Sequence, residues 1–106
     1  MRILFDQGTP APLRRFLTGH LVSTAYEEGW TTVTNGDLIR LAEQKGFELL
    51  ITTDTNLRYQ QNLESRSISI LVLTTTSWPR IKAAAALVVQ MVDDLGSVDY
   101  RELHIP

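Results

Sequence analysis

The chain has 106 residues, of which 43% are hydrophobic and 21% charged, and its formal net charge at pH 7 is −2. This length supports one hydrophobic core, so we expect a single domain over residues 1–106. The slightly acidic balance argues against a protein that coats nucleic acid nonspecifically, because such binding depends on many Lys and Arg contacts to phosphate. Cysteine is absent, which excludes a disulfide framework, a thiolate zinc site and a thiol nucleophile.

The start of the chain has no charged segment followed by a long apolar one. This pattern predicts neither a signal peptide nor a spanning helix. We therefore expect a cytoplasmic protein that has no membrane partner.

The first elements in chain order are two strands with a short helix between them. Residues 2–5 and 20–24 are runs of strand-forming side chains. Between these runs, Pro10 and Pro12 precede apolar residues at helical spacing. This spacing predicts a short helix, which Gly19 ends.

A longer helix is expected after the second strand. Asn35 offers an N-cap for a helix over about residues 36–45, and Gly46 supplies its end. Asp37 then lies in the first turn, where the helix dipole by itself favours a carboxylate.

The second half of the chain continues the alternation. We predict strands at residues 48–53 and 69–73, with a short polar helix over 56–63, and the second strand is apolar enough to be central. One long helix opens at residues 77–79 and runs to Gly96, because apolar residues recur along it at helical spacing. Residues 98–105 suggest a short terminal strand, at an edge of the sheet or in a subunit contact.

Alternating strands and helices predict an α/β fold. We expect a three-layer α/β/α sandwich around a mainly parallel sheet of about four to five strands. In such a sheet, ligands bind beyond the carboxyl ends of the strands, where the winding of the chain reverses.

Three acidic residues are the candidates for catalysis and for metal binding. Asp6 and Asp54 each follow a predicted strand, and Asp37 opens a helix. Mg²⁺ or Mn²⁺ prefers such hard oxygen ligands and is commonly held by one or two carboxylates together with substrate phosphate. The alternative for each residue is a structural role, in which the carboxylate caps a loop or a helix.

Other polar residues are candidates for a supporting role. Asn56, Asn35 and Glu43 could orient a water molecule or a ligand, although Glu43 and Asp37 point to different sides of a helix. The candidates for RNA contact are Arg14, Arg58, Gln60 and Gln61. Their alternative is an ordinary solvated surface. Asn56 has an equally good alternative as a turn residue.

Several other chemistries lack the residues they need. His20 and His104 do not have the spacing of a zinc-binding helix. The chain contains neither a nucleophile elbow of the Gly-x-Ser-x-Gly type nor a glycine-rich phosphate loop.

Most of the chain resembles a family, the small bacterial PIN-like proteins related to VapC-type ribonuclease toxins. The resemblance rests on three stretches, the last being the most specific. They are Leu4-Phe5-Asp6 followed by Pro10 or Pro12; Gly29-Trp30 with Asn35-Gly36-Asp37-Leu38; and Leu50-Ile51-Thr52-Thr53-Asp54-Thr55-Asn56-Leu57 followed by Tyr59-Gln60-Gln61-Asn62.

The resemblance implies a metal-dependent ribonuclease that cleaves RNA with Mg²⁺ or Mn²⁺ held by clustered acidic residues. It also implies a toxin with a cognate antitoxin as partner, and a homodimer. Asp6, Asp54 and Asp37 carry over as ligands. The chain departs from the family at Gln7, where relatives often have an acid, and at Asn56, the nearest polar substitute for a further carboxylate.

Two alternatives from other functional classes remain open. A noncatalytic module would keep the fold and bind RNA or a partner protein, with the carboxylates capping loops. A phospho-accepting receiver also places an aspartate on a parallel sheet, but this chain lacks paired acids in the first loop and a suitable Lys after the fourth strand.

Overall fold

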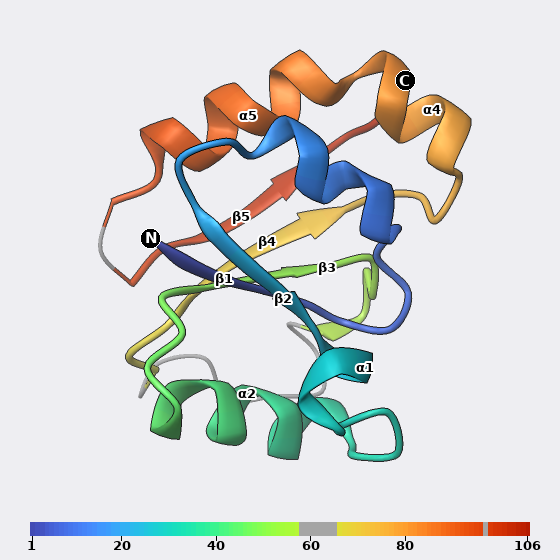
Figure 1. The fold of residues 1–106 in the computed structure, drawn as a ribbon. Coiled ribbons are helices and arrows are strands. Elements are labelled where there is room, and N and C mark those ends of the chain that lie inside the picture. The colour runs from blue at the N-terminus through green and yellow to red at the C-terminus, as the bar shows by residue number, and fades with distance from the viewer. Residues whose placement is uncertain (58–65, 97) are drawn as a thin grey trace.

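A computed structural model of the chain describes residues 1–57, 66–96 and 98–106, and it contains a five-stranded sheet (Figure 1). All four pairs of neighbouring strands are parallel, and the strand order is β2-β1-β3-β4-β5. The strands are β1 (Arg2–Phe5), β2 (Leu21–Thr24), β3 (Leu49–Thr52), β4 (Ser69–Leu73) and β5 (Tyr100–Leu103). The α/β prediction and the parallel sheet are confirmed, and the terminal strand is an edge strand.

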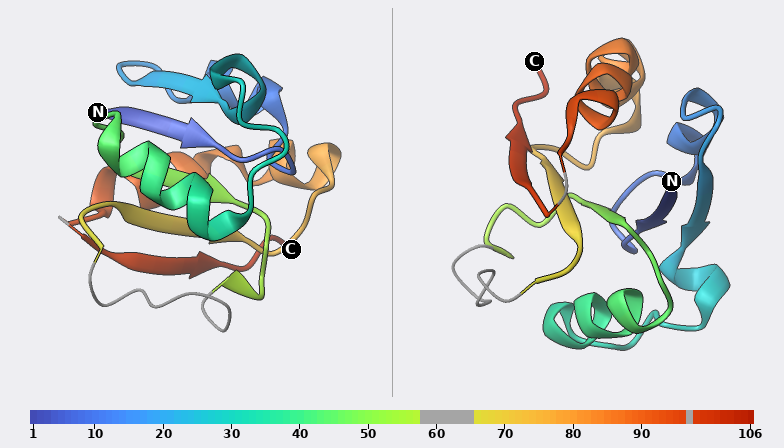
Figure 2. Two further views of the ribbon diagram at one scale, coloured as in Figure 1. Left: turned by 90° about the horizontal axis from the view of Figure 1, so that it is seen from below. Right: turned by 90° about the vertical axis from the view of Figure 1, so that its left-hand side faces the viewer.

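Helices cover both faces of the sheet, as Figure 2 shows. The helical elements are the 3-10 helix η1 (Ala11–Phe16) and the α-helices α1 (Ala25–Glu28), α2 (Asn35–Gln44), α4 (Trp78–Ala83) and α5 (Ala85–Asp94). Helix α2 lies on one face, and α4 and α5 lie on the other together with η1 (Figure 1). Within the described residues, no helix combines the length and the apolar character that crossing a bilayer requires.

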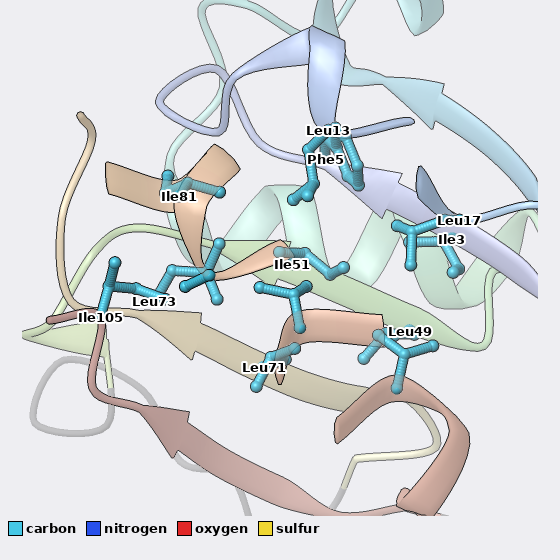
Figure 3. Close-up of a cluster of buried hydrophobic side chains, with 13 residues drawn as sticks. Ile3, Phe5, Leu13, Leu17, Leu49, Ile51, Leu71, Leu73, Ile81 and Ile105 are labelled. Carbon is cyan, nitrogen blue, oxygen red and sulfur yellow. The ribbon is translucent and has the colours of Figure 1, made fainter. Parts of the chain in front are cut away.

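The inner strands are buried because their side chains alternate between two apolar clusters. Ile3, Phe5, Leu49 and Ile51 pack with η1, α4 and α5 in the cluster of Figure 3. Their neighbours in sequence, such as Leu50, pack on the other face against α2. Strands covered on both faces read as continuous apolar runs, which is why the sequence predicts them well.

The start of α2 differs from the sequence prediction. Thr34, and not Asn35, is the N-cap, since its hydroxyl accepts a hydrogen bond from the backbone N–H of Asp37 at 3.4 Å. Asn35 is thus the first helical residue, and its side chain is free for another contact. At the other end, Gly46 has the left-handed conformation expected after a helix, with φ of 86°.

The last predicted helix is two helices. Ala84 separates α4 from α5, with φ of −103° and ψ of 15°. The guanidinium of Arg80 on α4 donates hydrogen bonds to the carbonyl oxygens of Ile105 at 2.8 Å and Pro106 at 3.0 Å. The bend lets α4 follow this C-terminal segment while α5 packs on the sheet. The predicted polar helix over 56–63 lies almost wholly outside the described residues.

Strand β1 is the point at which the winding of the sheet reverses. It pairs with β2 on one side and with β3 on the other, so the chain first moves to one side of β1 and then to the opposite side. Ligand sites in open α/β sheets lie at such a reversal, beyond the carboxyl ends of the strands. The loops that follow β1 and β3 are therefore the first place to look for a site.

Candidate functional site at the ends of β1 and β3

Asp6 and Asp54 lie at this reversal, on the loops that leave β1 and β3. Asp6 directly follows Phe5, the last residue of β1, which is in register with Ile51 of β3. The backbone N–H of Asp6 extends the pairing by donating to the carbonyl oxygen of Ile51 at 3.2 Å. Strand pairing therefore fixes the backbone from which the Asp6 carboxylate projects.

Two threonine hydroxyls hold the Asp6 carboxylate. Thr9, in the loop after β1, donates to Oδ1 at 2.6 Å, and Thr52 at the end of β3 donates to Oδ2. Both threonines are buried. The two donors bind different oxygens, so they fix both the position and the plane of the carboxylate.

The Asp54 carboxylate is held by two amide groups. The backbone N–H of Asn56 donates to Oδ1 at 3.0 Å, and the side-chain amide of Asn35 donates to Oδ2. Asn35 reaches Asp54 from the first turn of α2. This contact uses the side chain that the Thr34 cap leaves free.

Thr52 connects the two acidic residues. Its hydroxyl accepts a hydrogen bond from the backbone N–H of Asp54 at 3.0 Å while it donates to Asp6. A hydroxyl has one hydrogen to donate and two lone pairs to accept, so Thr52 can make both bonds at once. Thr52 therefore links the carboxylate of Asp6 to the backbone of Asp54.

Gly8 allows the two loops to approach each other. A Cβ atom at this position would lie 2.6 Å from the hydroxyl oxygen of Thr53 on the β3 loop. That distance is too short for a Cβ atom, so a larger residue at this position would force the Thr53 side chain or one of the two loops to shift.

The charge of the two carboxylates is not balanced by a neighbouring cation in the described part of the chain. None of the salt bridges there involves Asp6 or Asp54. All four protein donors to these carboxylates are neutral hydroxyl or amide groups. A nearby positive charge would lower the energy of the ionised pair.

This donor set fits a hard divalent cation. Each carboxylate oxygen accepts one hydrogen bond from the described residues and has room for a further ligand, since a carboxylate offers about four acceptor sites. Two carboxylates are enough to hold Mg²⁺ or Mn²⁺ when water and substrate phosphate complete the coordination. Residues 1–57, 66–96 and 98–106 provide no group of three or more His, Cys, Asp or Glu side chains that could hold a metal.

Asp37 is not part of this pair. Its carboxylate forms a salt bridge with Arg40, one turn along α2, at 2.6 Å, and the side chain is 51% exposed. The hydrogen bond and charge of Arg40 lower the pKa of Asp37 below its ordinary value of 3.8. The structure thus gives Asp37 a cation partner on the helix surface, and Asn35 from the same turn reaches Asp54 instead.

Glu43 has a structural role at the opposite end of the sheet. Its carboxylate accepts hydrogen bonds from the backbone N–H and the hydroxyl of Ser67, both at 2.6 Å, and it lies 3.7 Å from Arg66. Burial raises the pKa of Glu43, but the Ser67 hydrogen bonds and the charge of Arg66 outweigh burial and leave the pKa lowered. These contacts join the end of α2 to the start of β4.

An open cleft of about 700 Å³ adjoins Asp6. Besides Asp6, its lining includes Pro10, Arg14, Tyr26, Glu27 and Trp78. Arg14, one of the predicted RNA contacts, is paired with Glu27 through two hydrogen bonds of 2.8 and 3.1 Å. Of the other predicted contacts, Arg58, Gln60 and Gln61 lie outside the described residues.

The sequence analysis missed Thr9 and Thr52 as parts of the site. A signal was available for Thr52, because a hydroxyl residue two positions before Asp54 at the end of an apolar strand can bond to the following loop. No comparable signal exists for Thr9. Its contact with Asp6 depends on the turn after β1, in which the N–H of Thr9 donates to the carbonyl oxygen of Asp6 at 3.2 Å.

Comparisons with known proteins identify no relative. Models of protein families, curated protein sequences and solved structures all give no match to this chain. The functional argument therefore rests on the residues of the site.

Proposed function

We propose that this protein is a metal-dependent ribonuclease of the PIN-like type, which hydrolyses RNA phosphodiesters at Asp6 and Asp54. One observation carries the proposal. Two carboxylates without a cation partner among the described residues lie on the loops that follow the adjacent strands β1 and β3, linked through Thr52, at the reversal point of a parallel sheet. Such a pair favours a bound divalent cation, and the reversal point is where ligands of this fold class bind.

The residues of the site have distinct roles in this mechanism. Asp6 and Asp54 would hold Mg²⁺ or Mn²⁺, which when bound supplies an activated water and neutralises charge that develops on the phosphate. Thr9 and Thr52 orient the Asp6 carboxylate, and Asn35 orients that of Asp54. Residues that orient a metal ligand commonly contribute 10–100-fold to metal affinity, so we assign these three a positioning role.

Asp37 was predicted from the sequence as a third catalytic and metal-binding carboxylate, and it has a smaller part in the proposed mechanism. Its salt bridge to Arg40 occupies the carboxylate, although the residue remains on the same turn of α2 as Asn35. We propose that Asp37 does not bind the metal and that Asn35 provides the contact from α2.

Calorimetry with Mn²⁺, combined with a cleavage assay on single-stranded RNA, tests the proposal. The wild type is expected to bind Mn²⁺ and to cleave, and Asp54→Asn is expected to do neither. Asp37→Asn is the matched control, since it removes one negative charge 17 residues away in sequence on the exposed face of α2. A wild type that fails to bind Mn²⁺, or an Asp37→Asn variant as inactive as Asp54→Asn, would contradict the proposal.

A noncatalytic module that binds RNA or a partner protein is the second candidate. It is favoured by the hydrogen bonds themselves, because Asp54 accepts the N–H of Asn56 in a local turn and Asp6 accepts the hydroxyl of Thr9 in another. Gln7 also stands where PIN-like relatives often have an acid. Under this candidate, Asp54→Asn leaves RNA or partner binding unchanged.

The toxin role follows from the PIN-like resemblance, and we propose it on that ground together with a cognate antitoxin. Induced expression in bacteria tests it. The wild type should arrest growth, and Asp54→Asn, produced at the same level, should not. Equal growth of the two cultures would contradict the toxin role without affecting the assay on purified RNA.

A further inference from the structure

The cleft beside Asp6 has two aromatic side chains in its lining, Tyr26 and Trp78. Tyr26 lies on α1, directly after β2, and Trp78 begins α4, after the loop that follows β4. In Figure 1 both helices lie at the carboxyl end of the sheet, to which the strand arrows point. The two rings thus belong to the same end of the molecule as Asp6.

Both rings are carried by ordered backbone. The Trp78 ring is half-buried and packs at a centroid distance of 6.1 Å from Phe16. Tyr26 is 79% exposed, but α1 is held by a capping box in which Thr24 and Glu27 bond to each other's backbone N–H groups. An exposed aromatic ring on a fixed turn loses little entropy when a planar ligand stacks on it.

The charges that line the cleft disfavour the binding of an anionic group there. Among the described residues that line the cleft, Arg14 is the only Lys or Arg, and its guanidinium is paired with the carboxylate of Glu27. The hydrogen bond from Arg14 lowers the pKa of Glu27, so the pair stays ionised at neutral pH. In the absence of a bound metal the charge of Asp6 remains and repels a phosphate, and with a metal bound the phosphate is expected at the metal and not among the aromatic side chains of the cleft.

We propose that this cleft binds a nucleobase of single-stranded RNA, stacked on Tyr26 and bordered by Trp78, next to the phosphodiester that Asp6 and Asp54 act on. This inference rests on the proposed function. A nucleobase is planar and uncharged, which suits an aromatic cleft whose described lining residues include no unpaired cation. Stacking on an aromatic side chain contributes enough for one base to change affinity about tenfold.

Fluorescence anisotropy with two labelled probes tests the inference, in the presence of Ca²⁺. One probe is an octamer of adenosine ribonucleotides, and the other is an octamer of the same backbone with abasic residues throughout. The wild type should bind the adenosine octamer about tenfold more tightly. Tyr26→Ala should remove this preference, and Tyr26→Phe, which keeps the ring, should retain it.

Leu21→Ala is the matched control variant. Leu21 is 73% exposed on β2, near the other end of the strand, and it does not line the cleft. Circular dichroism checks that each variant is folded. Equal affinity of the wild type for the two probes, binding of neither probe, or an unchanged preference in Tyr26→Ala would overturn the inference.

The outcomes separate this inference from the proposed function. Base-dependent binding that needs Tyr26, in a protein that does not cleave RNA in Mn²⁺, supports the cleft and contradicts the ribonuclease. Cleavage that is lost in Asp54→Asn, together with base-independent binding, supports the ribonuclease and overturns the cleft assignment.

Discussion

The two ends of the sheet treat their carboxylates differently. At the amino end, Glu43 accepts the backbone N–H of Ser67 at 2.6 Å and lies 3.7 Å from the guanidinium of Arg66. This carboxylate joins the end of α2 to the segment before β4. At the carboxyl end, Asp6 and Asp54 are held by neutral groups only, among the described residues.

This difference distinguishes a structural carboxylate from a candidate ligand. Glu43 has hydrogen bonds and a guanidinium that compensate its charge in the folded protein, and its pKa is lowered accordingly. Hydrogen bonds also orient the carboxylates of Asp6 and Asp54. Among the described residues, however, no cation compensates their combined negative charge. Orientation without charge compensation is what a metal site needs before the metal binds.

The largest expected effect concerns stabilisation by metal. Mn²⁺ at 100 times its dissociation constant should stabilise the wild type by about 2.7 kcal/mol, and Asp6→Asn should abolish that gain. Glu43→Gln should keep the gain but lower the stability without metal by about 1–3 kcal/mol, because it weakens the contacts to Ser67 and Arg66. Urea unfolding with and without Mn²⁺ measures both. If Glu43→Gln loses the stabilisation by Mn²⁺, or if Asp6→Asn keeps it, the distinction between Asp6 as a metal ligand and Glu43 as a structural carboxylate is wrong.

Thr52→Val probes the residue that links the Asp6 carboxylate to the backbone of Asp54. The substitution keeps the shape but removes the hydroxyl, so the N–H of Asp54 and one oxygen of Asp6 lose their partner. We expect a loss of about 1–3 kcal/mol in unfolding free energy and weaker Mn²⁺ binding. Thr18→Val, at an exposed position near the end of η1, is the control and should change neither quantity. Wild-type Mn²⁺ affinity in Thr52→Val would show that the bridge does not position the ligands.

Asn35→Asp should add a further uncompensated negative charge at the carboxyl end of the sheet. The new carboxylate would lie beside that of Asp54, and like charges repel. We expect lower stability without metal and, on the order of tenfold, tighter Mn²⁺ binding, because a third carboxylate joins the site. Calorimetry and thermal unfolding measure the two effects. Weaker Mn²⁺ binding in this variant would place the metal away from Asn35.

The smallest expected effect is the loss of unfolding free energy in Glu27→Gln, a change in the cleft that adjoins Asp6. Both partners of the Arg14–Glu27 pair are more than a third exposed, so its contribution is at most about 1 kcal/mol. The pKa of Glu27 is lowered in the folded protein, chiefly by the hydrogen bond from Arg14. This contribution is therefore present at neutral pH and is lost as the pH falls below the ordinary value of 4.5.

Unfolding of wild type and Glu27→Gln should therefore differ at pH 7 and converge in acid. An unchanged difference at both pH values would mean that Glu27 acts through packing and not through its charge.

Much of the fold was predictable because its three inner strands, β1, β3 and β4, are buried on both faces. Residues 2–5 and 69–73 are the observed bounds of β1 and β4, and the predictions for β2 and β3 exceed the observed bounds by one residue or two. Helix ends were less predictable. Thr34 and Asn35 are both good N-cap residues. In the structure Thr34 caps α2 and the side chain of Asn35 contacts Asp54.

The candidate site was predictable in part. The positions of Asp6 and Asp54 after apolar strands indicated that both lie at the carboxyl edge of the sheet. That they are neighbours depends on the strand order, which places β1 between β2 and β3. The grouping of Asp37 with them could not be tested from spacing, because the rotation of α2 about its axis decides which side chain of the first turn faces Asp54.

The sequence by itself determined the inner strands of the sheet and that acidic residues follow two of them, because burial on both faces leaves a continuous apolar run. Tertiary structure decided what those residues contact. Thr52 links Asp6 to Asp54, Asn35 from the first turn of α2 contacts Asp54, and the helix that carries the apolar stripe from Ile81 to Val92 is interrupted at Ala84. Each of these depends on contacts between segments far apart in the chain, which local sequence patterns do not contain.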